Sequence, residues 1–227
     1  MARKNSEPVD LWHHERLMMS EGFDIVAGID EAGVGPLAGP VVAAVVVLPP
    51  DCSLDGINDS KQLTEKRREA AFITIREIAV SIGIGVVDPL EIDRINILQA
   101  AHQAMRIAIT KLTVEVKIFL VDGRPIRDFG YPHRAIVGGD SKSASIAAAS
   151  IIAKVTRDRI MCEYDAIYPQ YGFSKHKGYG SEDHLKNLRE HGACEIHRRS
   201  FAPVREVVSS DNGGAPKWVQ RDLILDD

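Results

Sequence analysis

Residues 28–48 read GIDEAGVGPLAGPVVAAVVVL, and this stretch predicts two apolar strands joined by a glycine-rich turn. Apolar, β-branched residues dominate its second half, which is typical of a strand buried on both faces. Two adjacent carboxylates, Asp30 and Glu31, end the first apolar run just before the glycines. An isolated Asp-Glu pair is usually a solvated turn, so its meaning depends on whether carboxylates end other strands as well.

Strands and helices alternate outward from this stretch. Short strands are predicted over 24–29, 41–48 and 80–87, followed by two strands that end at Asp122 and Asp140. Helices are predicted from about Thr64, over 88–112 with a break near Asn96, over 141–169, and from a Ser181 cap to a Gly192 stop. This order indicates an α/β domain in which helices cover a mixed sheet.

Length and composition are those of one ordinary globular domain. The chain has 227 residues, of which 44% are hydrophobic and 26% are charged. We expect a catalytic domain over 1–208 and a flexible tail over 209–227, which is rich in glycine and polar residues and then acidic. The net charge of −4 does not predict a nucleic-acid partner, but residues 141–205 hold 11 Lys and Arg against 7 Asp and Glu. That local excess permits a face that binds a polyanion.

Cysteine spacing and hydropathy indicate the compartment. The three cysteines have no metal-like spacing, which is typical of free thiols in a reducing environment. The N-terminus lacks the apolar segment of a signal peptide, and no apolar run approaches the ~20 residues of a membrane span. We therefore expect a cytoplasmic monomer with no membrane partner.

Carboxylates follow several of the predicted strands. Asp30, Asp122 and Asp140 each end an apolar run and have a glycine within three residues, and Glu31 adds a fourth carboxylate. Ligand sites of α/β sheets tend to form at strand ends. Four converging negative charges require cations, and all-oxygen ligands favour Mg²⁺ or Mn²⁺. Two such ions ~4 Å apart suit in-line phosphoryl transfer, because one activates water and the other stabilises the leaving oxygen.

Plainer interpretations exist for these residues. Asp122 before a glycine could form a turn, and Asp140 could be the N-cap of the following helix. The glycines GVGPLAG also fit a loose dinucleotide-binding pattern. That pattern fails physically, because Pro36 and the run from Val41 lead into a strand and no helix N-terminus is available for a pyrophosphate.

Five motifs together resemble bacterial ribonuclease HII, the type 2 ribonuclease H family. They are GIDEAGVGPLAGPV, NDSKQLT, FLVDG, GGDSKSASIAAASIIAKVTRDR and YGFSKHKGYGSEDHL, in the family's order from about Ile25 to His191. The resemblance implies a ribonuclease H-like fold with a C-terminal helical extension. It implies cleavage of RNA in RNA/DNA hybrids and 5′ to single ribonucleotides in duplex DNA, a reaction of ribonucleotide excision repair. By motif position, the family's metal-binding and catalytic carboxylates fall on Asp30, Glu31, Asp122 and Asp140, with two Mg²⁺ or Mn²⁺ ions bound during catalysis.

The resemblance also implies substrate-binding residues. The family's ribose-reading tripeptide falls on Gly33, Val34 and Gly35, and its junction-sensing tyrosine falls on Tyr179, which is otherwise an ordinary loop tyrosine. The family has arginine where this chain has Val34. Valine keeps its backbone groups but lacks a guanidinium that could bind phosphate, and it resists unusual φ values, so we expect a distorted loop and reduced activity. Candidate phosphate contacts, each of which could simply be solvated, are Lys61, Lys142, Lys175, Lys177 and Arg157.

These features predict a divalent-metal-dependent endoribonuclease that leaves 3′-hydroxyl and 5′-phosphate ends. Two alternatives stay open at this point. One is another nuclease of the same fold with a different substrate. The other is a protein that binds hybrids with impaired or no turnover because of Val34.

Overall fold

The computed structural model describes residues 9–53 and 63–210 of the chain. The predicted phosphate contact Lys61 lies outside the described residues, and so do residues 211–227 of the predicted tail. No helix in the described ranges is both long enough and apolar enough to cross a membrane.

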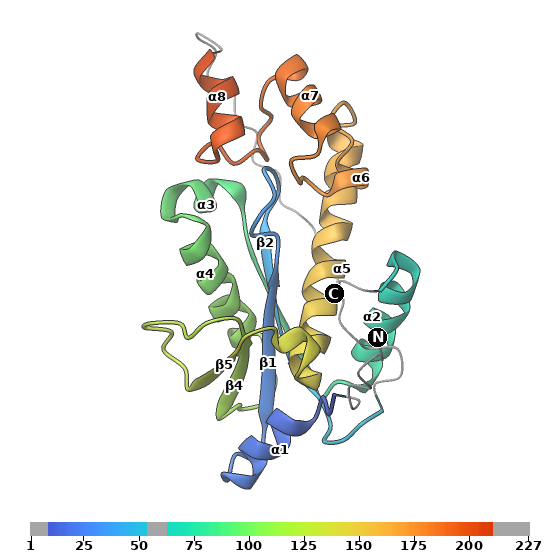
Figure 1. The fold of residues 1–227 in the computed structure, drawn as a ribbon, viewed down its shortest axis with the longest axis vertical. Coiled ribbons are helices and arrows are strands. Elements are labelled where there is room, and N and C mark those ends of the chain that lie inside the picture. The colour runs from blue at the N-terminus through green and yellow to red at the C-terminus, as the bar shows by residue number, and fades with distance from the viewer. Residues whose placement is uncertain (1–8, 54–62, 211–227) are drawn as a thin grey trace, which may run out of the picture.

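A mixed sheet of five strands forms the centre of the molecule, as predicted (Figure 1). Its strands are β1 (Val26–Ala32), β2 (Val41–Val47), β3 (Ser81–Val87), β4 (Ile118–Asp122) and β5 (His133–Ile136), in the spatial order β3-β2-β1-β4-β5. The β1–β2 and β2–β3 pairs are antiparallel, whereas β1–β4 and β4–β5 are parallel. Because β1 and β4 are parallel neighbours, their carboxyl ends lie at the same edge of the sheet.

Helices cover both faces of this sheet. The helices of the described residues are α1 (His13–Ser20), α2 (Glu65–Ile78), α3 (Pro89–Ile95), α4 (Ile97–Thr110), α5 (Ala144–Ile167), α6 (Phe173–His176), α7 (Glu182–His191) and α8 (Ala202–Ser210). Of these, α4 packs on one face of the sheet, and α2 and α5 pack on the other. Alternate residues of β2 divide between the two faces. Ala43 and Val45 pack toward α4, and Ala44 and Val46 pack toward α5 and α2.

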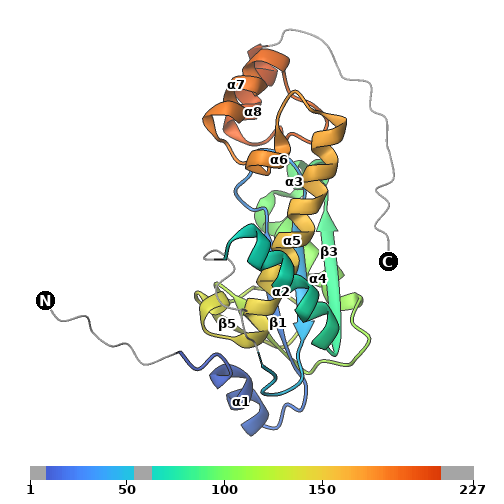
Figure 2. The ribbon, with the colours of Figure 1, turned by 90° about the vertical axis from the view of Figure 1, so that its right-hand side faces the viewer.

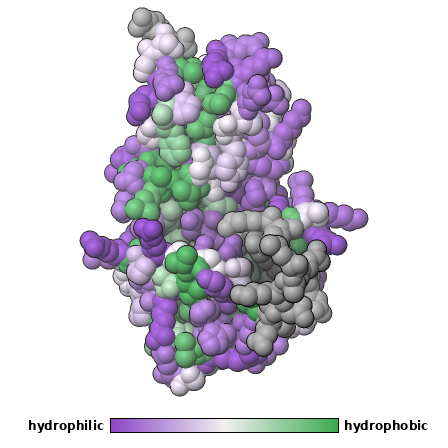
Figure 3. Space-filling model, in the orientation of Figure 1, coloured by the Kyte–Doolittle hydropathy of each residue, from purple (hydrophilic) through white to green (hydrophobic). Residues whose placement is uncertain are grey.

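The C-terminal helices stand apart from the sheet. The long helix α5 runs beyond the sheet edge, where α6 packs against it, and α7 and α8 lie at the same end of the molecule (Figures 1 and 2). This arrangement is the predicted C-terminal helical extension. In the view of Figure 1 the surface is mostly polar, and apolar side chains gather between the α7–α8 pair and α3 (Figure 3).

Local capping rules account for several predicted boundaries. The Thr64 side chain accepts a hydrogen bond from Arg67 N–H and caps α2, and Ser181 caps α7 in the same way. Asn96 separates α3 from α4 with φ of 69° and caps α4. Gly192 ends α7 as predicted.

Two predictions about the chain around Asp140 are wrong. The strand expected to end at Asp140 already ends at Ile136, and Asp140 lies in a short 3₁₀ helix over Gly139–Ser141. Asp140 is also not the N-cap of α5, because Ser143 takes that role and accepts a hydrogen bond from Ile146 N–H. The segment between the predicted helices over 141–169 and from Ser181 contains the short helix α6. Helix α1 was not predicted from the sequence.

Glycines allow two helices to approach the sheet closely. A Cβ atom on Gly85 of β3 would lie 1.9 Å from the carbonyl oxygen of Ala104 in α4. A Cβ atom on Gly28 of β1 would lie 2.1 Å from the carbonyl carbon of Ser145 in α5. Contacts this short exclude any larger residue, so Gly85 brings α4 directly against β3 and Gly28 brings α5 directly against β1. The close approach of α5 places Ser150 beside the carboxylates near the end of β1.

Candidate active site

A pocket opens at the edge of the sheet where β1 and β4 end. Its wall is formed by Asp30, Glu31, Ala32, Gly33, Val34, Gly35, Arg68, Asp122, Ser150, Lys154 and Tyr179. The pocket therefore brings together three of the four predicted carboxylates, the whole Gly33–Val34–Gly35 tripeptide and Tyr179. These residues come from β1, β4, α2, α5 and the loop before α7, so only the folded chain assembles them.

Asp30 is a buried carboxyl in the lining of this pocket. Its side chain is buried, and the pKa of its carboxyl is raised well above the usual value by burial first and then by the negative charge of Glu31, with a smaller contribution from Asp122. Two hydrogen bonds oppose this shift, one from Ser150 and one from the Glu31 N–H to Asp30 Oδ1 at 2.8 Å. Repulsion among anionic oxygens in a partly enclosed pocket is the environment that a hard divalent cation relieves.

Asp140 lies next to this group but not in the pocket wall. It is buried, and the N–H of the preceding residue, Gly139, donates a hydrogen bond to Asp122 Oδ1 at 2.7 Å. Within the described ranges, no three Asp, Glu, His or Cys side chains stand in an arrangement that would already hold a metal ion. The donors that do meet are all carboxylate oxygens, which fit Mg²⁺ or Mn²⁺. The metal-binding role of the four carboxylates therefore stays a prediction.

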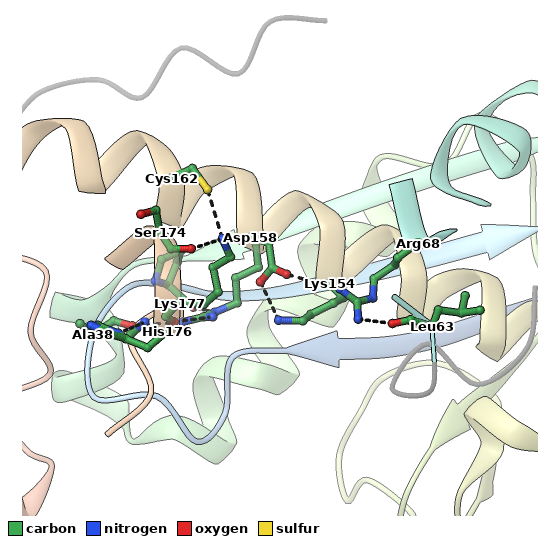
Figure 4. Close-up of polar contacts among 12 residues, drawn as sticks. Ala38, Leu63, Arg68, Lys154, Asp158, Cys162, Ser174, His176 and Lys177 are labelled. Atoms are coloured by element: carbon green, nitrogen blue, oxygen red, sulfur yellow. Dashed lines mark hydrogen bonds and ion pairs between the residues drawn. The ribbon is translucent and has the colours of Figure 1, made fainter. Parts of the chain in front are cut away.

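Two cations that sequence reasoning missed also line the pocket. Lys154 Nζ donates to Asp158 Oδ1 at 2.6 Å, and Arg68 Nη1 lies 3.8 Å from Asp158 Oδ2 (Figure 4). Ser150, Lys154 and Asp158 follow one another at intervals of four on α5 and therefore share one helix face. The spacing of these residues indicates a shared polar helix face, but only the folded structure shows that this face lies beside Asp30.

The tripeptide loop is not distorted by Val34, contrary to expectation. The left-handed conformation falls on Gly33, with φ of 99°, and Val34 is not among the described residues with positive φ. A Cβ atom on Gly33 would lie 2.2 Å from Arg157 Nε, so glycine is required there for two reasons. Val34 is exposed, and its side chain is not strained by the backbone.

Arg157 is a buried structural residue, so its predicted contact with phosphate is wrong. It is 1% exposed, and its donors are used by the carbonyls of Pro40 at 3.0 Å, Ala38 at 3.1 Å and Lys177 at 3.0 Å. Burial lowers the pKa of Arg157 to about 10, so the guanidinium stays charged at pH 7. It ties the loop after β1 to the loop that carries Tyr179.

Tyr179 lies beside the tripeptide. Its side chain is 47% exposed, and a Cβ atom added to Gly35 would be in ordinary contact with its ring, 3.7 Å from Cε1. The Leu37 N–H donates to the Gly178 carbonyl at 2.8 Å, which fixes the two loops against each other. The predicted pair of tripeptide and tyrosine therefore forms one surface.

A chain of two buried histidines supports Tyr179 from below. The Cys194 N–H donates to His197 Nδ1 at 3.1 Å, so His197 carries its proton on Nε2 and donates it to His184 Nε2 at 3.0 Å. His184 then donates from Nδ1 to the Tyr179 carbonyl at 2.8 Å. Burial lowers the pKa of His184 to about 4 and that of His197 to about 3, which keeps both rings neutral. His184 is therefore a buried, hydrogen-bonded structural residue.

The three predicted lysine contacts within the described residues lie outside the pocket wall. Lys142 is exposed, and its ammonium donates to the Val137 carbonyl at 2.6 Å. Lys177 donates to the Ser174 carbonyl at 2.5 Å and lies 3.2 Å from Cys162 Sγ (Figure 4). Lys175 is exposed. Contact of these lysines with phosphate stays a prediction.

Comparisons with known proteins agree on one family. Residues 27–204 match the family model described as Ribonuclease HII. A ribonuclease HII of Endomicrobium trichonymphae is 51% identical over 201 residues, which are 88% of this chain and 96% of that protein. The crystal structure of ribonuclease H2 from Pyrococcus horikoshii OT3 is 29% identical with a TM-score of 0.69, over 82% of this chain and 98% of the other.

A more distant solved structure shows the same fold. It is that of Bst-RNase HIII in complex with Mn²⁺, which is 20% identical with a TM-score of 0.65, over 93% of this chain and 77% of the other. The ribonuclease H-like fold expected from the motifs is thereby confirmed.

Proposed function

The chain belongs to the ribonuclease HII family of nucleases, and from this premise we propose that it is a divalent-metal-dependent endoribonuclease. Its substrates are RNA/DNA hybrids and duplex DNA that contains single ribonucleotides, which it cuts on the 5′ side of the ribonucleotide. The observation that carries the proposal is a single pocket that joins Asp30, Glu31 and Asp122 to the Gly33–Gly35 loop and Tyr179.

The carboxylates account for the chemistry. Asp30, Glu31, Asp122 and Asp140 would hold two Mg²⁺ or Mn²⁺ ions, and Mn²⁺ is present in a solved structure of the same fold. Such ions supply activation of water and stabilisation of the leaving 3′ oxygen, which leaves 3′-hydroxyl and 5′-phosphate ends. The hydrogen bonds from Ser150 and the Glu31 N–H orient the Asp30 carboxylate in the pocket. Lys154 and Arg68 add positive charge at the same wall, which favours approach of a phosphodiester.

The loops account for the choice of substrate. The backbone of Gly33, Val34 and Gly35 lies beside the carboxylates, where it can meet the 2′-hydroxyl that distinguishes RNA from DNA. Tyr179 extends the same surface by one ring and can pack on the neighbouring deoxyribose, where a 2′-hydroxyl would be crowded.

Cleavage of matched duplexes tests this function. A labelled duplex with one ribonucleotide should be cut in Mg²⁺ or Mn²⁺, and its all-DNA counterpart should stay intact. Hydrogen bonds to the 2′-hydroxyl contribute ~1–3 kcal/mol, and displacement of the phosphate from the catalytic groups costs further rate. Equal cutting of both duplexes would indicate a general nuclease. Retention of the ribonucleotide duplex without cutting would indicate a binding protein.

A further inference from the structure

We propose that Arg198, assisted by Arg157, is a positioning residue that turns the peptides of the Gly33–Gly35 loop so that the N–H groups of Val34 and Gly35 face the substrate. Arg198 lies between α7 and α8, in the C-terminal extension. The proposal rests on the proposed function, because it names the group that prepares this loop to bind a ribonucleotide.

The guanidinium of Arg198 is inserted behind the loop. The residue is fully buried, and its Nη2 donates to the Gly33 carbonyl at 2.6 Å while its Nη1 donates to the Val34 carbonyl at 3.1 Å. Its Nε donates to the Gly39 carbonyl at 3.0 Å. A planar guanidinium offers donors in a rigid fork, so it fixes the direction of two consecutive carbonyls at once.

Because Arg198 fixes the direction of the Gly33 and Val34 carbonyls, it also fixes the direction of the N–H groups of Val34 and Gly35. The described residues contain no cis peptide bond, and in a trans peptide the C=O and N–H groups point in opposite directions. Since the Gly33 carbonyl points at Arg198, the Val34 N–H points away from it, and the Gly35 N–H is directed in the same way by the Val34 carbonyl. In the part of the chain that the structure describes, neither N–H donates a hydrogen bond to the protein. Both residues are exposed in the pocket wall.

Two successive N–H groups on an exposed turn form a binding site for an oxygen atom. The positive charges of Arg198 and Arg157 lie behind these groups, and Arg157 contacts the same loop through Pro40. Burial and then the charge of Arg157 lower the pKa of Arg198 to about 9, so both guanidiniums stay charged at pH 7. The two arginines therefore orient the loop from the side opposite the pocket. Their hydrogen bonds to its carbonyls do not involve the side chain at position 34, so the loop keeps an unstrained form with valine there.

Substitution of the fork by a single ammonium tests the proposal. Arg198→Lys keeps the charge but cannot hold both carbonyls. The readout is the ratio of two Kd values, for an all-DNA duplex and for the same duplex with one ribonucleotide, measured by fluorescence anisotropy in EDTA. This ratio is insensitive to a fraction of unfolded protein. We expect it to fall at least fivefold in Arg198→Lys, with a smaller fall in Arg157→Lys.

Arg106→Lys is the matched control. Arg106 also donates to two backbone carbonyls, those of Phe129 at 3.2 Å and Asp128 at 3.1 Å, in a loop outside the pocket wall. The ratio of the two Kd values in Arg106→Lys should equal that of the wild type. A folded Arg198→Lys protein with a ratio within twofold of the wild type, or an equal fall in Arg106→Lys, would overturn the role of Arg198. If Arg198→Lys does not fold, an unchanged ratio in Arg157→Lys overturns it instead.

The same experiment separates this role from the proposed function. A wild-type protein that neither cuts nor prefers the ribonucleotide duplex refutes the proposed function, and the role of Arg198 with it. A wild-type protein that discriminates, together with an Arg198→Lys variant that discriminates equally well, refutes only the positioning role.

Discussion

Replacement of Asp30 by asparagine is expected to stabilise the metal-free protein while abolishing most of its activity. Asp30 is buried beside Glu31 and Asp122, so burial and their negative charges destabilise its ionised form in the absence of cations. A pair of like charges ~5 Å apart interacts by about 3 kcal/mol at an effective dielectric constant of 20. Weaker hydrogen bonds from Ser150 and the Glu31 N–H to a neutral amide remove ~1–2 kcal/mol of that gain. A net stabilisation of about 1 kcal/mol corresponds to a rise in Tm of ~2–4 °C for a chain of this length.

A bound divalent ion should make the wild type more stable than Asp30→Asn. A divalent ion at 100 times its Kd stabilises the folded state by about 2.7 kcal/mol, which raises the Tm of the wild type by ~5–11 °C. Asp30→Asn should show less than half of this shift and should cut a ribonucleotide-containing duplex at least ~100-fold more slowly. Duplex binding should be largely retained, because contacts with phosphates supply most of the affinity.

Differential scanning fluorimetry in EDTA and in a Mn²⁺ titration measures both effects, with single-turnover cleavage in parallel. Asp24→Asn is the matched control, because Asp24 is an exposed carboxylate just before the opposite end of β1. It should leave the Tm, the Mn²⁺ shift and the rate unchanged. A lower Tm for Asp30→Asn in EDTA, or a Mn²⁺ shift equal to that of the wild type, would refute the reasoning about repulsion and metal. Cutting at nearly the wild-type rate would refute the catalytic role of Asp30.

Three further predictions concern the loops of the pocket and the residues beneath them. Tyr179→Ala should slow cutting of a single-ribonucleotide duplex more than cutting of a long RNA/DNA hybrid, since only the first presents a deoxyribose to the ring; equal losses in kcat/KM would reduce Tyr179 to a packing residue. Val34→Arg should raise kcat/KM at least ~10-fold and steepen the salt dependence of binding, because a charge-assisted bond to phosphate contributes ~1.5–3 kcal/mol; an unchanged value would show that the loop is adapted to valine. The low pKa values of His184 and His197 mean that the folded protein binds fewer protons than the unfolded chain between pH 6.5 and about 4, so stability falls as the pH drops through this window, by about 3 kcal/mol for His184 alone. Thermal unfolding at pH 7, 5.5 and 4.5 should show a flatter pH dependence in His184→Gln than in the wild type or in His13→Gln, and parallel curves would contradict the assignment.

Local rules made much of the fold predictable from the sequence. The β-branched run from Val41 favours a buried strand, and a cap such as Thr64, Asn96 or Ser181 accepts a hydrogen bond from an N–H group three residues away. These interactions span a few residues, so the chain order alone contains them. The motifs around Asp30 and Asp122 were found for the same reason, since both carboxylates directly follow apolar runs.

Only the tertiary structure decided the role of the long polar side chains. The hydrogen bonds of Arg198 to Gly33 and Val34 join residues more than 150 positions apart, and no local pattern distinguishes this buried arginine from a solvated one. The prediction that Arg157 contacts phosphate is wrong for that reason, and the position of Lys154 in the pocket wall follows only from the packing of α5 against β1. The burial of a charge depends on which carbonyls the folded chain brings to it, because a guanidinium is stable away from water only where enough acceptors surround it.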